Sequence, residues 1–250
     1  MAIETSSSIC GVSILYDQEI LGIEEKNVSR KHAELLPGIT QTALDKANKT
    51  LDSIDAIAIS IGPGSFTGLR VGLGFAKGLA YSKCLPIVPV PSMLSLAFSM
   101  RKFEPKQGIL HSHANKIFFQ SFGWKNNIPF SKKKPKLLEI NDCVQSLSSG
   151  FHYKCENILP DDTRVKIATH SSSNIGILAS IYFNDFIVGS RQKLETINIF
   201  TEDGKINQNG PSEYIGLDRF DARKKIVEKL SELEILVKVE NIKNKIPYGD

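Results

Sequence analysis

The most informative stretch of this sequence is IGPGSFTGLRVGLGFAKGL, residues 61–79. The apolar run Ile54–Ile61 that leads into it is typical of a β-strand buried on both faces. The loop Gly62–Gly68 follows, and the residues after it predict a helix that ends at about Ser82. We therefore expect a buried strand, a glycine-rich loop and a helix in direct succession.

This order can hold a phosphate group at the helix N-terminus, but the known phosphate-binding loops require residues that are missing here. A P-loop needs a Lys-Ser/Thr pair after its last glycine, whereas Gly68 is followed by Leu69 and Arg70. A dinucleotide loop needs a glycine where Thr67 stands, and an acid further on, but positions 56 to 103 contain no Asp or Glu. A nucleophile elbow would need glycines at Pro63 and Thr67. The glycine loop therefore fits none of these three motifs, and we assign it no catalytic, cofactor-binding or metal-binding residues.

The helix itself contains glycines at a spacing of four: Gly68 with Gly72, and Gly74 with Gly78. Residues four apart lie on the same helical face. Each glycine costs a soluble helix about 1 kcal/mol relative to alanine, so we expect another part of a protein to pack closely against the glycines. Either the helix packs closely inside its own domain, or it packs against a helix of another subunit, as small residues allow. We favour the second alternative, in which leucine at Gly72 or Gly78 breaks subunit association and leaves the monomer folded.

The flanking sequence places this unit within a larger α/β pattern. Three short strands are expected before residue 27, and apolar residues from Leu35 to Ala47 recur on one helical face. A further strand at Pro86–Val90 and a helix at Ser92–Met100 complete the order β-β-β-α-β-α-β-α. This is the order of the actin-like ATPase fold, also called ASKHA or ribonuclease H-like.

The pattern is weaker beyond Phe103. We expect a strand at Asn115–Phe122, a helix at Ser173–Phe183 and an amphipathic helix at Leu217–Leu236. The loop Lys132–Lys136 contains four lysines, which either contact RNA phosphates or form an ordinary solvated surface.

Composition sets broad limits on the class of protein. The 250 residues carry a net charge of +4, far below that of a dedicated nucleic-acid-binding protein. The four cysteines form no CxxC pair, so the sequence indicates neither a zinc knuckle nor a redox motif. No apolar run reaches the roughly 18 residues of a membrane span. The first residues do not form a signal peptide, and we expect a cytoplasmic protein.

Three motifs together resemble the bacterial TsaB (YeaZ) family. They are Ala2-Ile-Glu-Thr-Ser6, Arg30-Lys-His-Ala-Glu34 with Leu36-Pro37, and Gly62-Pro-Gly-Ser-Phe-Thr-Gly-Leu-Arg-Val-Gly72. The resemblance is dense over residues 1–105 and thin from there to about 182. It implies an actin-like fold with a reduced second domain and no chemistry of its own.

The resemblance also implies partners. Members of the family pair with TsaD, which transfers a threonylcarbamoyl group to N6 of adenosine 37 in tRNA, and the pair engages the ATPase TsaE. The contact with TsaD uses the first two helices, here about Lys31–Asn48 and Thr67–Ser82. A homodimer through the same helices is an open alternative, and tRNA is contacted indirectly. The predicted interface residues are Leu36, Ile39, Ala43, Gly68, Val71, Gly72, Phe75, Gly78 and Leu79.

The H-x-x-x-H metal pair of the catalytic subunit is missing from this chain. His111 and His113 are two residues apart, which is a poor basis for a metal site. The chain also departs from its own family in the second domain. The family's Asp-Ala-Arg and Glu-Val-Tyr segments are replaced by Ser112-His-Ala-Asn115 and Ile117-Phe-Phe119.

The last part of the chain resembles a different protein family, the valyl-tRNA synthetases. The segments that carry this second resemblance are Asn184–Gly189, Ile197–Asn207, Gly216–Val227 and Pro247–Asp250. They match the synthetase's editing domain in order and approximate spacing. The His-Asp pair that precedes this region in the synthetase is replaced by Ile181 and Tyr182, so we do not transfer the editing activity.

We therefore divide the chain into an actin-like domain at 1–105, a reduced second domain at 106–182 and a synthetase-like fragment of mixed α/β structure at 183–250. The fragment arose by gene fusion or assembly error, or is a divergent C-terminus. The predicted function is that of a non-catalytic subunit which binds and activates a TsaD-like transferase. The alternatives are an actin-like ATPase or kinase and, for the tail, an inactive editing fragment.

Overall fold

A computed structural model describes residues 1–186 except 145–146, 148, 158 and 160–164. These residues all belong to the first of two compact units, Met1–Asn198. The second unit, Ile199–Asp250, lies outside the described residues, as does the helix predicted at Leu217–Leu236.

The first sheet contains the three predicted N-terminal strands and two parallel strands beside them. Its order is β3-β2-β1-β4-β5, with β1 antiparallel to β2 and parallel to β4. The strands are β1 (Ala2–Glu4), β2 (Ile9–Tyr16), β3 (Glu19–Asn27), β4 (Ile57–Ser60) and β5 (Ile87–Val90). The predicted meander and the buried strand before the glycine loop are confirmed.

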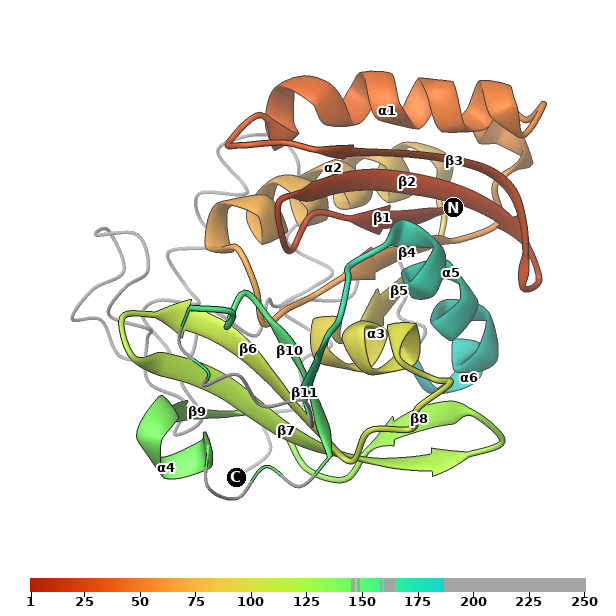
Figure 1. Cartoon of the computed structure of the whole chain (residues 1–250). Helices are drawn as coiled ribbons and strands as arrows, with labels where there is room; N and C mark the ends of the chain where they lie inside the picture. The colour runs from red at the N-terminus through yellow and green to blue at the C-terminus, as the bar shows by residue number, and fades with distance from the viewer. Residues whose placement is uncertain (145–146, 148, 158, 160–164, 187–250) are drawn as a thin grey trace, which may run out of the picture. The chain divides into compact units, whose positions relative to one another are not determined.

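Helices cover both faces of this sheet (Figure 1). Helices α1 (His32–Lys46) and α2 (Phe66–Lys83) share one hydrophobic cluster with Ile57 and Ile59 of β4. Ala58, which points to the opposite face, belongs to a second cluster with residues of α3 (Ser92–Ser99). The alternation along β4 explains why the strand is apolar throughout, since both of its faces are covered.

The chain from β6 to β11 forms a second sheet and contains few helical residues among those described. The order of this sheet is β11-β10-β6-β7-β8, and β9 also pairs with β7. Its elements are β6 (Gln107–His113), β7 (Lys116–Lys125), β8 (Ile128–Ser131), β9 (Lys136–Glu139), α4 (Ile140–Val144), β10 (Gly150–Tyr153) and β11 (Val165–Ile167). Strand β7 confirms the strand predicted at Asn115–Phe122. The only helix described between β6 and β11 is the short α4, as expected of a reduced second domain.

The chain then returns to the first sheet through α5 (Ser172–Ile181), followed by α6 (Phe183–Phe186). At Gly176 the helix comes so close to the sheet that an added Cβ would lie 2.2 Å from Leu15 Cδ1. The predicted helix at Ser173–Phe183 is confirmed. Although α5 falls in the predicted 106–182 domain, it packs on β1 and β2, and the domain boundaries themselves stay predictions.

A carboxylate of β3 holds the start of α5 in place. Glu25 Oε1 accepts hydrogen bonds from the Ser171 hydroxyl at 2.9 Å, from the Ser172 amide at 2.5 Å and from the Ser172 hydroxyl at 2.7 Å. A negative charge at a helix N-terminus satisfies free amides and interacts favourably with the helix dipole.

We expect Glu25→Gln to lower the free energy of unfolding by about 1–2 kcal/mol, because the charge-assisted bonds to α5 become neutral. Denaturant unfolding followed by circular dichroism measures this change. Glu19→Gln is the matched control, since Glu19 is an exposed carboxylate on the same strand, and we expect it to stay within about 0.5 kcal/mol of the unchanged chain. Equal unfolding midpoints for both variants would show that Glu25 does not hold α5.

Candidate partner interface

The glycines of α2 face two different environments. A Cβ at Gly68 would lie 2.0 Å from the Thr5 carbonyl oxygen, and one at Gly72 would lie 2.1 Å from Thr5 Oγ1. A Cβ at Gly74 or Gly78 would meet nothing within 4 Å. The first pair therefore serves close packing within this chain, which was the alternative not favoured from the sequence, and only the second pair is open.

Five of the nine predicted interface residues are buried within the chain itself. Leu36, Ile39 and Ala43 of α1 are 1%, 3% and 0% exposed and lie in the core between α1 and the first sheet. Gly68 and Gly72 are also buried, against Thr5. The apolar stripe of α1 packs on the chain's own sheet, so we leave these residues out of the proposed interface.

The remaining predicted residues form one surface on α2. Val71, Phe75 and Leu79 are partly buried at the edge of the core, and Gly78 is exposed, as is the neighbouring Gly74. The spacings of three and four residues place all five on one side of the helix. We call these five residues the outer face of α2: an apolar ridge beside a groove left by two glycines.

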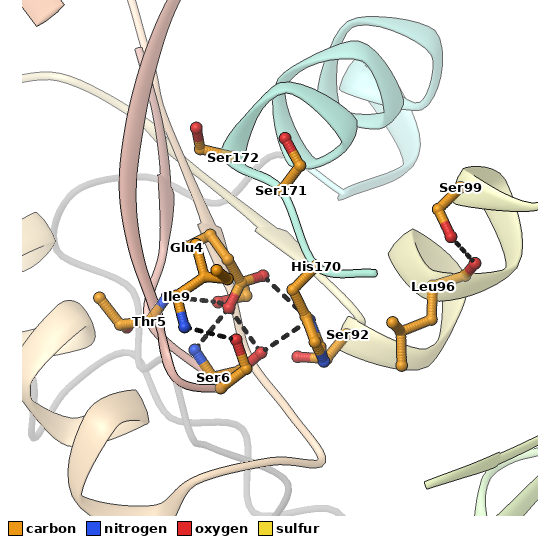
Figure 2. Close-up of polar contacts among 12 residues, drawn as sticks. Glu4, Thr5, Ser6, Ile9, Ser92, Leu96, Ser99, His170, Ser171 and Ser172 are labelled. Carbon is orange, nitrogen blue, oxygen red and sulfur yellow. Dashed lines mark hydrogen bonds and ion pairs between the residues drawn. The ribbon is translucent and has the colours of Figure 1, made fainter. Parts of the chain in front are cut away.

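A second feature, which the sequence did not predict, is a buried polar cluster below the N-terminus of α2. Glu4, at the end of β1, accepts hydrogen bonds at Oε1 from the Ser6 amide at 2.5 Å and the Ser6 hydroxyl at 2.6 Å (Figure 2). The Ser60 hydroxyl donates to the same oxygen at 3.2 Å. The other carboxylate oxygen of Glu4, Oε2, lies 3.5 Å from His170 Nδ1. Both side chains are fully buried.

The ionisation of Glu4 depends on its neighbours. Burial by itself would raise the pKa of this carboxyl, but the His170 imidazole and the hydrogen bonds from Ser6 together hold the pKa below its usual value. Glu4 is therefore a buried carboxylate whose charge is compensated inside the fold.

Glu4, Ser6 and His170 are the residue types of a hydrolase triad, but their geometry does not suit one. In a triad the carboxylate and the hydroxyl occupy opposite nitrogens of the imidazole. Here Ser6 Oγ, at 3.4 Å, and Glu4 Oε2, at 3.5 Å, both face Nδ1. His170 Nε2 is buried without a hydrogen-bond partner in the structure, and Ser6 is only 2% exposed. The cluster is therefore suited to fixing the backbone around it and not to acyl transfer.

A pocket of about 710 Å³ opens beside the start of α2. It is lined by Ser7, Ser8, Asn27, Val28, Ser29, Arg30, His32, Ser65, Thr67, Gly68 and Lys154. The described lining residues include Arg30, His32 and Lys154, and none of the described lining residues is Asp or Glu, so this part of the lining suits an anion better than Mg²⁺. His32 is 7% exposed, with Nε2 3.3 Å from the Ile9 carbonyl oxygen.

The other residues considered from the sequence lie apart from this region. His111 Nε2 lies 2.9 Å from the Ala114 carbonyl oxygen, and His113 Nδ1 lies 3.0 Å from Ser112 Oγ. Within the described residues, no group of three His, Cys, Asp or Glu side chains could hold a metal ion, and no helix is long and apolar enough to cross a membrane. The lysines of the Lys132–Lys136 loop are exposed.

Comparison with known proteins finds two relationships. Residues 10–112 match the family model described as TsaD, tRNA N6-adenosine threonylcarbamoyltransferase. The tRNA threonylcarbamoyladenosine biosynthesis protein TsaB of Haemophilus influenzae is 33% identical over 122 residues, 48% of this chain and 51% of that protein. The valine–tRNA ligase of Pelagibacter ubique is 68% identical over 68 residues, 27% of this chain and 8% of the ligase. The chain thus spans about half of the TsaB relative and a small part of the ligase.

Solved structures agree on the fold. YeaZ from Pseudomonas aeruginosa has a TM-score of 0.66 at 21% identity, over 78% of this chain and 96% of that chain. A second structure from the same organism, described as an uncharacterized protein with similarity to peptidase YeaZ, has the same TM-score at 20% identity. The α/β actin-like fold and both resemblances, to TsaB and over a short segment to valyl-tRNA synthetase, are confirmed.

Proposed function

We propose that this chain takes part in forming N6-threonylcarbamoyladenosine in tRNA, as a non-catalytic subunit that binds and activates a TsaD-like transferase. The outer face of α2 is the observation that carries this proposal. At two helical glycines, Gly74 and Gly78, an added Cβ would meet nothing within 4 Å. Since each glycine costs about 1 kcal/mol relative to alanine, an approaching helix gives them a use that the chain alone does not.

Physical chemistry supports a helix as the occupant of this face. Glycines four apart leave a groove in which a second helix backbone can approach closely. Val71, Phe75 and Leu79 supply apolar area along that groove, and they are already fixed by packing on the core, so little side-chain entropy is lost on binding. A TsaD-like subunit is the proposed partner, with a TsaE-like ATPase joining the pair, and the cytoplasm is the proposed location.

The non-catalytic part of the proposal has its own support. The hydroxyl and the carboxylate of the buried cluster share one nitrogen of the imidazole, and the cluster is closed to substrate. Among the described residues that line the pocket beside α2 there is no Asp or Glu, whereas the Mg²⁺-nucleotide site of an actin-like ATPase or kinase would need a carboxylate. In this proposal the chain activates the transferase by binding to it. The transferase, and not this chain, contacts the tRNA.

Reconstitution tests this function directly. Threonylcarbamoyl incorporation into tRNA is measured for a TsaD-like transferase and a TsaE-like ATPase, with and without the full chain. We expect incorporation to fall to background when the chain is left out, because the transferase then lacks its activating subunit. Full incorporation without the chain would refute the proposal, and modification by the chain in the absence of the transferase would refute its non-catalytic part.

A further inference from the structure

Ser6 connects the buried cluster to the start of α2. Its amide and hydroxyl donate to Glu4, and its hydroxyl faces His170 (Figure 2). Its carbonyl oxygen accepts a hydrogen bond from the Ser65 amide at 2.6 Å. Ser65 caps α2, because its Oγ accepts from the Gly68 amide at 3.3 Å. A continuous set of hydrogen bonds thus runs from the Glu4–His170 pair to the first turn of α2.

His170 also connects distant parts of the chain. It lies between β11 and α5, and its ring meets that of Tyr153 from β10 edge-on, with centroids 4.5 Å apart. Through Glu4 and Ser6, the second sheet is therefore connected to the turn between β1 and β2. The same turn contacts α2 closely, since Gly68 and Gly72 pack on Thr5.

Stability alone is a poor explanation for this pair. Removing a carboxylate from water is costly, and buried charged or polar pairs are often replaceable by apolar residues without loss of stability. A buried carboxylate does, however, accept several directional hydrogen bonds at once, which fixes the turn that donates them. Glu4 accepts bonds from both Ser6 and Ser60, so it connects the β1–β2 turn at Ser6 to the end of β4.

We propose that Glu4 and His170 are positioning residues for the partner interface: acting through Ser6 and Ser65, they fix the first turn of α2 and so the orientation of its outer face. The pair touches neither a substrate nor the partner. Only the binding measurement rests on the proposed function. The effect of the pair on the first turn of α2 can be measured by amide exchange in the free chain.

The test uses the full-length chain and two readouts. One is the affinity for the TsaD-like subunit by calorimetry, and the other is amide hydrogen exchange at Gly68 and Leu69 in the free chain. We expect His170→Gln to weaken binding about tenfold, as is typical of couplings between sites, and to speed exchange at these two amides. Exchange within α1 should not change. Glu4→Gln with His170→Gln should restore part of the affinity, because the double variant contains no uncompensated buried charge.

Ser6→Ala is a milder variant for the case that His170→Gln does not fold. It removes only the hydroxyl that contacts Glu4 and His170. We expect a loss of affinity in the same direction, about threefold, together with faster exchange at Gly68. Ser95→Ala is the matched control: Ser95 is a fully buried serine of α3 whose hydroxyl has no hydrogen-bond partner in the structure. It should alter neither readout.

Two results would overturn the inference. One is unchanged exchange at Gly68 and Leu69 in both His170→Gln and Ser6→Ala, whatever the affinity. The other is an effect of Ser95→Ala as large as that of Ser6→Ala. If the unchanged chain binds no transferase, the proposed function fails, but faster exchange in these variants still supports the positioning role.

Discussion

Gly68→Ala is expected to destabilise the first compact unit by about 3–5 kcal/mol, although it adds a single methyl group. The new Cβ would lie 2.0 Å from the Thr5 carbonyl oxygen, which is backbone and cannot rotate away. Either α2 or the β1–β2 turn must move, and the turn is held by Ser6 and Glu4. Domains of this kind have only about 5–15 kcal/mol of stability, so much of it would be lost.

The same substitution six residues later should have the opposite effect. At Gly74 the added Cβ meets nothing within 4 Å, so only the helix propensity changes. Gly74→Ala should therefore stabilise the chain by up to about 1 kcal/mol. Denaturant unfolding of both variants measures the difference. A Gly68→Ala chain within about 1 kcal/mol of the unchanged protein would mean that α2 does not approach Thr5 as the structure has it.

The contrast between these glycines shows what the sequence could predict. At about 100° per residue, Gly68 and Gly72 lie about 40° apart around the helix axis, whereas Gly74 lies about 120° from Gly68. The two pairs therefore belong to different faces, and that much was readable from the spacing. Which face meets the chain's own backbone was not readable, because it depends on the position of Thr5 after folding. Gly72→Leu, expected from the sequence to break association alone, should also destabilise the fold.

Periodicity has the same limit in α1. It identified Leu36, Ile39 and Ala43 as one apolar face, and they are indeed buried. The spacing of apolar residues predicts that a helix face is buried, but it does not predict which surface packs against that face. The burial of β4 was predictable because its run is apolar at every position: Ile57 and Ile59 belong to one core and Ala58 to the other, as expected of a strand covered on both faces.

The buried cluster was not predictable, because Ser6 and His170 are 164 positions apart in the sequence. One signal was present: Glu4 is an acid at the end of a short buried strand, and a buried carboxylate needs a partner. Nothing in the sequence said that the partner is a histidine just before α5. The synthetase-like segment is described only at its start, where Phe186 stacks on Tyr182 with ring centroids 5.1 Å apart.

Gly78→Leu gives the sharpest test of the partner interface. A leucine here fills the groove between the apolar ridge and the open side of α2, where a partner helix is proposed to lie. We expect the affinity for the TsaD-like subunit to fall at least about 100-fold, which corresponds to about 2.7 kcal/mol. The fold should not suffer, because leucine is a better helix former than glycine and nothing lies within 4 Å of the new Cβ.

Calorimetry with the purified transferase measures the affinity, and circular dichroism of the free variant establishes that it is folded. Gly78→Ala should retain most of the binding, since a methyl group only narrows the groove. Gln18→Leu adds the same apolar side chain at an exposed turn away from α2 and should bind as the unchanged chain does. If Gly78→Leu also bound normally, the outer face of α2 would not be the interface. If it lost binding and also dissociated a homodimer, one face would serve both associations, because a surface filled by leucine is closed to either helix.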